Sequence, residues 1–222
     1  MAHYLIFLGS TRTSTPPSPA RLGERVAKAC ERLLSSLPQT TAEIIDPLAL
    51  NLSDPFKPHF AYAKNDAPED LAELADKITN ADGFVMVSPE YNHSMSPALS
   101  HLLNHFGASL FAFKPSAIVT YSMGQWGGVR AAVAMRAFLS ELGCLPVSAM
   151  VHVPKAQEAL NEDGQFEQEQ VRWESYFGRT LGQLMWWAEA AASYKSQVDP
   201  TKVSPAFKTA PSQRNAPGSE NS

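Results

Sequence analysis

The sequence predicts an α/β protein built on a doubly wound parallel sheet of five strands, with helices on both faces. Short apolar runs alternate along the chain with longer segments whose apolar residues recur at helical spacing. The best of these runs are continuously apolar, which is typical of strands buried on both faces of a parallel sheet. The 222 residues, 44% of them hydrophobic, are enough for one such domain.

The strands are the short apolar runs that end at turn residues. The first run leads directly into Gly9-Ser10, and the third is the apolar sequence GFVMVS. In chain order, the expected strands are Tyr4–Leu8, Glu43–Asp46, Gly83–Ser88, Ser116–Tyr121 and Leu145–Val153. Ligands of doubly wound sheets bind beyond the carboxyl ends of the strands, so the loops that follow the strands are where we expect the chemistry.

The helices are the segments whose apolar residues lie three and four positions apart. Pro68-Glu69-Asp70 supplies start signals for the second helix, and Gly143 stops the fourth. The expected helices cover residues 22–37, 68–78, 97–106, 128–142 and 173–188.

Two segments fall outside this pattern. Pro47–Ala67 is rich in Pro, Asn and Asp, and we expect a long loop of functional or mobile character. The chain from Asp199 onward is polar and rich in Pro and Ser, which is typical of disorder. The expected organisation is therefore one domain over residues 1–198 and a disordered tail over residues 199–222.

Charge and composition exclude several functional classes. A net charge of −4 and a pI near 5.9 give no overall attraction to nucleic acid or to anionic membranes. No apolar stretch approaches the roughly 20 residues that span a bilayer, and the amino terminus lacks the basic start of a secretory signal. The two cysteines, Cys30 and Cys144, are expected to be buried thiols. We expect a cytoplasmic protein with neither a nucleic-acid nor a membrane partner.

The first candidate loop is Gly9-Ser10-Thr11-Arg12, directly after the first strand. Hydroxyls, backbone N–H groups and a following helix N-terminus favour an anion, and Arg12 adds a charge-assisted contact. The dinucleotide fingerprint G-x-G-x-x-G and the Walker lysine are both absent, so a monophosphate fits best. A plain turn that caps the next helix is the competing interpretation.

Two further loops follow the third and fourth strands. Ser88–Pro97 carries an aromatic ring among amide, hydroxyl and carbonyl groups, which suits a flat heteroaromatic ligand. Tyr121–Gly128 carries three glycines in five positions, which lets the backbone approach a ligand closely. Each could instead be a surface turn or a tight connection.

Together, these loops resemble the NADPH-dependent FMN reductase family of flavodoxin-like flavoproteins. The family motifs G-S-x-R, P-E-Y-N-x-S and S-x-G-x-x-G-G-x-R match Gly9–Arg12, Pro89–Ser94 and Ser122–Arg130. The resemblance covers about residues 4–190. It implies a flavodoxin-like sheet with strand order 2-1-3-4-5 and FMN as cofactor, with NADPH or NADH as co-substrate.

The resemblance also implies roles for individual residues. The first group would hold the FMN phosphate: Ser10, Arg12, Arg21 and Gly23. The second group would line the isoalloxazine ring, with the aromatic side chain packed on it: Pro89, Glu90, Tyr91 and Asn92. The third group would meet the pyrimidine edge of the ring: Ser122, Met123, Gly124, Gly127 and Gly128.

The reaction implied by the resemblance is ping-pong reduction of a small planar acceptor, such as a quinone or a free flavin. Hydride would pass from NAD(P)H to flavin N5 and electrons then to the acceptor, so that no side chain acts as the catalytic group. The resemblance and the aromatic last helix predict a homodimer or homotetramer. A non-enzymatic electron carrier, or a redox-sensing flavoprotein that docks a partner protein, is the alternative.

Some residues depart from the family pattern or suggest other chemistry. Thr13–Ala20 is an apparent insertion in the phosphate loop, and Leu99–His105 replaces the family sequence L-K-N-x-x-D-W near the usual subunit contact. His101 and His105 have the spacing of metal ligands but lack a third ligand, which favours a surface or interface role. Ser122 precedes Gly124, yet the G-x-S-x-G nucleophile motif fails because position 120 is Thr.

Overall fold

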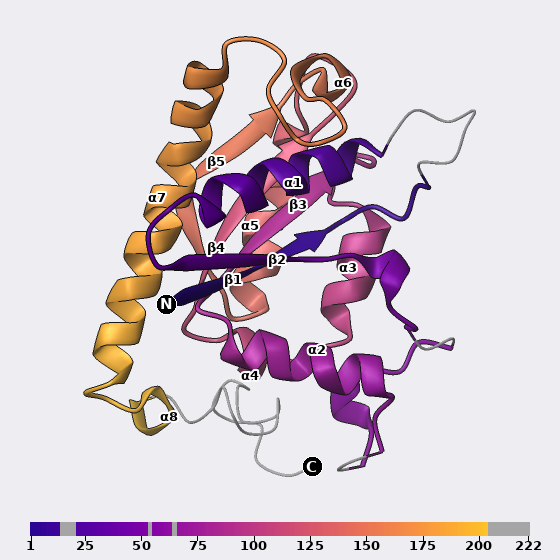
Figure 1. Ribbon diagram of the computed structural model, residues 1–222. Coiled ribbons are helices and arrows are strands. Elements are labelled where there is room, and N and C mark those ends of the chain that lie inside the picture. The colour runs from indigo at the N-terminus through magenta and orange to yellow at the C-terminus, as the bar shows by residue number, and fades with distance from the viewer. Residues whose placement is uncertain (14–20, 53–54, 64–65, 204–222) are drawn as a thin grey trace.

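The computed structural model describes residues 1–13, 21–52, 55–63 and 66–203, and its centre is one parallel sheet between two helical layers (Figure 1). The strand order β2-β1-β3-β4-β5 confirms the predicted doubly wound topology. All four neighbouring pairs are parallel. The strands are β1 Ala2–Leu8, β2 Thr40–Ile45, β3 Gly83–Pro89, β4 Pro115–Tyr121 and β5 Leu145–Val153.

Helices follow the strands and cover both faces of the sheet. The longest is α7, at 26 residues. The α-helices are α1 Leu22–Ser35, α2 Glu69–Asn80, α3 Pro97–Asn104, α4 Ala108–Phe111, α5 Val129–Glu141, α6 Ala156–Ala159, α7 Gln170–Lys195 and α8 Pro200–Val203. Two 3₁₀ turns, η1 Pro47–Ala49 and η2 His59–Ala61, lie between β2 and α2.

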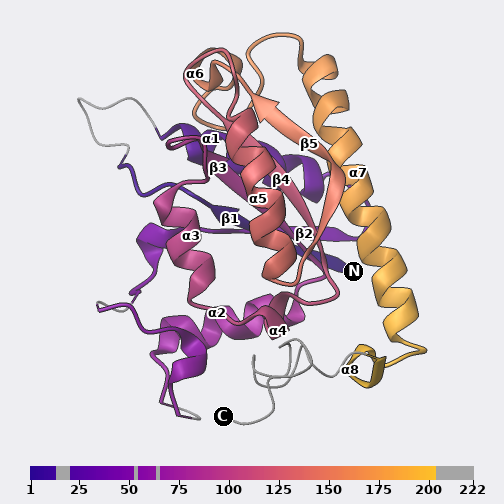
Figure 2. The same cartoon turned by 180° about the vertical axis from the view of Figure 1, so that it is seen from behind.

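The core has two parts because successive side chains of a strand point to opposite faces. In β1, Tyr4, Ile6 and Leu8 belong to the core beneath α1 and α7. Leu5 and Phe7 belong to the other core, beneath α2, α3 and α5. Figure 1 shows α1 in front of the sheet, and Figure 2 shows α5 and α3 in front of it from behind. Every residue of Leu5–Leu8 is fully buried, which explains the continuous apolar run.

Several segments differ in extent from the sequence expectation. Strand β2 begins at Thr40, three residues before the expected start, because it is an edge strand whose half-exposed residues need not be apolar. The expected loop Pro47–Ala67 contains η1 and η2. The last helix is longer at both ends than residues 173–188.

The segment from Asp199 onward, which the sequence predicts to be disordered, begins with a short helix. Its first residues include α8, Pro200–Val203, and residues 204–222 lie outside the part of the chain that the structure describes.

The cysteine expectation is confirmed. Cys30 and Cys144 are buried and free, and burial raises the pKa of each thiol to about 12. Neutral thiols of this kind are poor nucleophiles. In the described ranges, no helix combines the length and the hydropathy that a membrane span requires.

Candidate functional site

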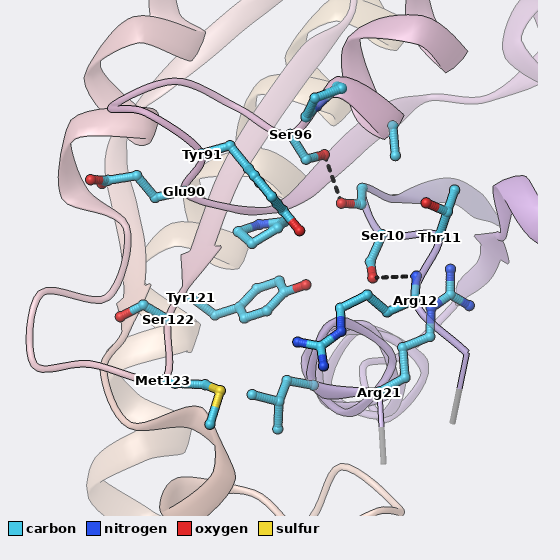
Figure 3. A pocket seen from close by; sticks show the side chains of 15 residues that line it. Ser10, Thr11, Arg12, Arg21, Glu90, Tyr91, Ser96, Tyr121, Ser122 and Met123 are labelled. Carbon is cyan, nitrogen blue, oxygen red and sulfur yellow. Dashed lines mark hydrogen bonds between the residues drawn. The ribbon is translucent and has the colours of Figure 1, made fainter. Parts of the chain in front are cut away.

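The loops after β1, β3 and β4 meet in one cavity of about 340 Å³ at the carboxyl ends of these strands (Figure 3). This is the place where a doubly wound sheet binds its ligand. The cavity is lined by Gly9, Ser10, Thr11, Arg12, Arg21, Leu22, Pro89, Glu90, Tyr91, Ser96, Pro97, Ala98, Tyr121, Ser122 and Met123.

The loop after β1 is held tightly against β3 and α3. The Gly9 N–H donates to the Val87 carbonyl at 2.7 Å, and the Ser96 hydroxyl donates to the Gly9 carbonyl at 2.7 Å. A Cβ on Gly9 would lie 2.6 Å from the Val87 carbonyl oxygen, so a larger residue would push the loop outward. Ser96 also accepts a hydrogen bond from the Leu99 N–H and thereby caps α3. The two hydrogen bonds of Gly9 therefore fix the start of the loop after β1.

The loop after β3 closes as a two-residue hairpin turn. Tyr91 and Ser94 exchange two backbone hydrogen bonds, of 3.0 and 2.9 Å. Asn92 and His93 form the tip, with φ of +50° and +62°, which is the conformation of a type I′ turn. The turn leaves the Tyr91 side chain on the wall of the cavity, 48% exposed. Asn92 therefore serves the turn in this structure, since Asn tolerates positive φ well.

Glu90 lies on the wall of the cavity, but its carboxylate is engaged by α5. It accepts hydrogen bonds from the N–H groups of Arg130 and Ala131, at 3.1 and 3.3 Å. The Arg130 guanidinium lies 3.4 Å from the same carboxylate. A carboxylate at a helix N-terminus is stabilised by the helix dipole. Glu90 therefore links the second loop to the third and is turned away from the middle of the cavity (Figure 3).

The loop after β4 is organised by the Ser122 hydroxyl. It donates to the Gly124 carbonyl at 2.9 Å and accepts from the Gly127 N–H at 3.0 Å. Gly127 and Gly128 have φ of +60° and +79°, which side chains rarely adopt. The loop then enters α5. Because its hydroxyl bonds within its own loop, nothing in the geometry supports Ser122 as a nucleophile.

The two arginines in the cavity differ in their partners. Arg21 is buried, with 4% of its side chain exposed, and its two terminal nitrogens bind the two carboxylate oxygens of Asp46 at 2.5 and 3.0 Å. Arg12 is exposed, and it forms no ion pair with any residue that the structure describes. Arg12 is therefore the cation that is available to a ligand anion, whereas Arg21 ties the start of α1 to the end of β2.

The structure brings together eight of the thirteen residues that the sequence predicted to bind the cofactor. The residues that line the cavity are Ser10, Arg12, Arg21, Pro89, Glu90, Tyr91, Ser122 and Met123. The others support the loops or lie beside the cavity: Gly23, Asn92, Gly124, Gly127 and Gly128. The role of each residue toward a cofactor stays a prediction.

The predicted ligand set did not include several side chains of the cavity, of which Tyr121 and Ser96 are the two polar ones outside the loop after β1. Tyr121 is the last residue of β4 and is buried, so its position in the sequence is that of a core residue. Ser96 precedes a proline at a helix start, and this capping signal alone does not indicate a cavity. A polar residue at the last position of a buried strand is the signal that could have found Tyr121.

The arrangement fits a flat ligand with one phosphate. The lining includes the Ser10 and Thr11 hydroxyls and the Arg12 guanidinium, which are donors for an anion. It also includes the rings of Tyr91 and Tyr121 with Pro89 and Met123, which suit a planar aromatic group. The Glu90 carboxylate, which lines the cavity, and the Asp46 carboxylate, which binds the lining residue Arg21, are both engaged by arginines.

The metal interpretation of His101 and His105 finds no support among the described residues. No cluster of three metal-binding side chains occurs among them. His105 is buried in ring contact with Phe56 and His101, and its Nδ1 is 2.8 Å from the His101 carbonyl oxygen.

Comparison with known proteins identifies relatives by sequence and by structure. A family model described as NADPH-dependent FMN reductase matches residues 3–158, which includes all three loops. The NADH:(hydroxy)cinnamate reductase subunit CrdA of Vibrio ruber is 34% identical over 114 residues, 49% of this chain and 56% of that protein. A quinone reductase of Escherichia coli K12 is 39% identical over 75 residues, 32% of this chain and 40% of that protein. The chain thus spans about half the length of these relatives or less.

The fold is shared with solved flavoenzymes. FerB, an NAD(P)H:(acceptor) oxidoreductase from Paracoccus denitrificans, superposes with a TM-score of 0.65 at 19% identity. The superposition covers 86% of this chain and 99% of FerB.

Proposed function

Because the chain belongs to the NADPH-dependent FMN reductase family, we propose that it binds FMN in the cavity at the carboxyl ends of β1, β3 and β4. It would use NADPH or NADH to reduce a small planar acceptor, such as a quinone or a free flavin. The observation that carries the proposal is that one cavity combines the Ser10 and Thr11 hydroxyls and the Arg12 guanidinium with the rings of Tyr91 and Tyr121.

The proposal assigns the phosphate to the loop after β1. The Ser10 and Thr11 hydroxyls would donate hydrogen bonds, and Arg12 would supply the charge, because no described carboxylate neutralises it. Arg21 would act by holding the end of this loop through Asp46. The rings of Tyr91 and Tyr121 would contact the flat part of the cofactor.

FMN, when bound, supplies the capacity to accept a hydride and to pass electrons on. The protein then has to bind, orient and expose it. Among the described residues that line the cavity there is no histidine, lysine or cysteine, and the Glu90 carboxylate is engaged by α5, so we propose no side-chain acid or base. Tyr91 and Met123 are 48% and 55% exposed and would border the open side, where donor and acceptor would bind in turn. This use of one site by two substrates is the ping-pong scheme.

The experiment that tests the proposal is spectroscopic and kinetic. The purified protein, mixed with FMN and freed of excess by gel filtration, should carry a flavin absorption spectrum. NADPH oxidation should then be sustained when a quinone is added, with parallel lines in double-reciprocal plots. A flavin that is reduced once without turnover would instead favour the electron-carrier alternative, and the absence of flavin uptake would refute the proposal.

We further propose a homodimer or homotetramer. Trp186, Trp187 and Tyr194 of α7 are 63%, 42% and 63% exposed, and the two Trp rings pack edge to face at 4.7 Å. Exposed aromatic residues of this size favour an interface. Light scattering at micromolar concentration should give at least twice the 24.2 kDa mass of one chain, and a monomer would refute this proposal.

A further inference from the structure

Three large apolar side chains are exposed on the loops that follow β3 and β4. Tyr91 and Met123 line the cavity and are 48% and 55% exposed. Trp126 lies in the same loop as Met123, three residues further along, and is 58% exposed. A group of exposed apolar side chains beside a cavity indicates a binding surface. The proposed function uses Tyr91 and Met123 but gives Trp126 no role.

Trp126 is connected to the wall of the cavity through two charged side chains. The Arg130 guanidinium lies over the Trp126 ring, 5.8 Å from the ring centroid, which is the geometry of a cation–π contact. The same guanidinium lies 3.4 Å from the carboxylate of Glu90, a residue of the cavity lining. Glu90 in turn accepts hydrogen bonds from the first N–H groups of α5. The indole ring is therefore held beside the wall that Glu90 forms, with Arg130 over one of its faces.

The backbone that precedes Trp126 is fixed against the segment that follows β5. Three consecutive carbonyls of the loop accept hydrogen bonds of 2.9 to 3.1 Å from that segment. The pairs are Ser122 with the Ala156 N–H, Met123 with the Gln157 side chain and Gly124 with the Lys155 N–H. A side chain on a backbone that is already ordered loses less freedom when a ligand binds, which favours binding.

A substrate that meets a cofactor bound in the cavity has to contact residues outside the lining. The cavity has a volume of about 340 Å³, near the lower limit for the site of a single small molecule. The second ligand would then lie at the open side, which Tyr91 and Met123 border and to which Trp126 is the next aromatic residue. Indole is the aromatic side chain with the most negative ring face, so it stacks well on a planar ring that is poor in electrons.

We propose that Trp126 is a specificity-determining residue: its exposed ring stacks on the electron acceptor, and Arg130 orients the ring for that contact. The inference rests on the proposed function and narrows its acceptor to planar, electron-poor molecules with at least two fused rings, such as a naphthoquinone. A fused ring system can extend beyond the cofactor and cover the indole. Ferricyanide also accepts electrons but has no ring to stack, so it serves as the reference acceptor.

The test measures kcat/KM for each substrate separately. Trp126→Ala should lower kcat/KM for naphthoquinone about 3- to 10-fold, the range for loss of one aromatic pair, and Trp126→Phe should restore most of it. The values for ferricyanide and for NADPH should change by less than about 2-fold in the same variants, because the lost contact is one of stacking on the acceptor.

Phe60→Ala is the matched control. It removes an aromatic side chain that is 66% exposed. Phe60 belongs to η2, whose first N–H donates to the His105 carbonyl just beyond the last residue of α3, whereas the cavity lies at the first residues of that helix. This variant should match wild type for all three substrates.

A binding measurement without turnover supplies a second readout. The oxidised, FMN-loaded protein does not react with a quinone, so naphthoquinone can be titrated while the flavin absorbance is recorded. The Kd should rise about 3- to 10-fold in Trp126→Ala. Arg130→Met keeps the indole but removes the guanidinium from its face, so the Kd should rise by a smaller factor. An unchanged Kd in Arg130→Met would overturn the orienting role of Arg130.

Two results would overturn the role of Trp126 while leaving the proposed function intact. Unchanged naphthoquinone binding and kcat/KM in Trp126→Ala would mean that the indole does not contact the acceptor. Equal losses for naphthoquinone, ferricyanide and NADPH would mean that the substitution disturbs the loop instead of removing a stacking contact. A wild-type protein that takes up no FMN would refute the proposed function itself, and the inference with it.

Discussion

The sheet has a cavity at each end, and the two differ in chemistry more than in size. The cavity at the carboxyl ends, about 340 Å³, is lined by hydroxyls, two arginines and two tyrosine rings. The cavity at the amino ends of β4 and β5, about 500 Å³, lies against α7 and α8, and among the described residues that line it only Lys195 is charged. Its walls include Phe113, Leu145 and Trp187.

The difference follows from the direction of the strands. In a parallel sheet crossed by helices, each strand ends where the next helix begins, so N–H groups and polar loop residues gather at the carboxyl edge. At the amino edge, helices end and apolar side chains meet. The cavity at the amino ends is thus the poorer candidate for a phosphorylated cofactor, although it is the larger of the two.

The largest expected effect on stability concerns Arg21, which lines the polar cavity but whose guanidinium is paired with Asp46. Arg21→Met leaves the Asp46 carboxylate without its partner and should lower the free energy of unfolding by about 3 kcal/mol. This value is in the lower part of the range for a broken buried ion pair, because Asp46 is partly exposed. Urea denaturation measures this. Arg172→Met, which breaks an exposed pair with Glu169, should cost less than about 1 kcal/mol.

A stable Arg21→Met protein with lost FMN affinity would contradict this assignment. In that case Arg21 would be a direct ligand of the phosphate, as the sequence alone suggested.

Substitution of Arg12 should have the opposite effects to substitution of Arg21: weaker FMN binding and nearly unchanged stability. Arg12→Ala should weaken FMN binding by about 1.5–3 kcal/mol, the range for hydrogen bonds to a charged group, with little change in unfolding free energy because Arg12 is exposed. Riboflavin binding should be unaffected, since that ligand has no phosphate. Isothermal titration calorimetry measures both. Lys155→Ala, which removes an exposed cation that pairs with Glu158, serves as the control, and equal losses in both variants would contradict a specific role.

Near neutral pH, we expect the pH dependence of stability to come from buried histidines, none of which is among the described residues that line the two cavities. Burial lowers the pKa of His105 and of His152 below the usual 6.5. The unfolded chain then binds protons that the folded protein does not, so the free energy of unfolding should fall as pH drops below about 6.5.

Urea denaturation at pH 7.5 and pH 5 checks this prediction. His105→Gln should show a smaller loss between the two pH values than wild type, whereas His93→Gln, at an exposed turn tip, should behave like wild type. An identical loss in His105→Gln would exclude His105 as a source of the dependence.

The smallest expected effect concerns the apolar cavity. Trp187→Ala removes its largest side chain, which is 42% exposed, and should change FMN affinity by less than about 2-fold because the site lies at the other end of the sheet. Flavin fluorescence titration measures this. A marked loss of FMN affinity in Trp187→Ala would contradict the assignment of FMN to the polar cavity alone.

Much of the fold could be predicted because its signals are local. Leu5–Leu8 and the apolar run of β3 are buried on both faces, and continuous apolar sequence records that burial. Strand β2 was only partly recognised because an edge strand with residues such as Thr41 and Glu43 lacks that signal. The three loops were recognised as neighbours because the residues of each motif lie close together in sequence and each motif follows a strand.

The parts of the site that the sequence did not predict depend on distant partners. Arg21 meets Asp46, 25 positions away, and Glu90 meets the start of α5, 40 positions away. The Tyr121 hydroxyl lies where a Cβ on Gly23 would contact it, at 2.4 Å. None of these contacts produces a periodic pattern in the sequence. Sequence reasoning therefore assigned Arg21 and Glu90 to the cofactor and Tyr121 to a strand, and it did not identify their partners in the fold.

The most direct measurement is a crystal structure of the protein soaked with FMN. The account predicts one flavin in the cavity at the carboxyl ends of β1, β3 and β4, with its phosphate against Ser10 and Arg12 and its ring beside Tyr91. A flavin in the apolar cavity beside Trp187, or a polar cavity left empty at saturating FMN, would contradict it.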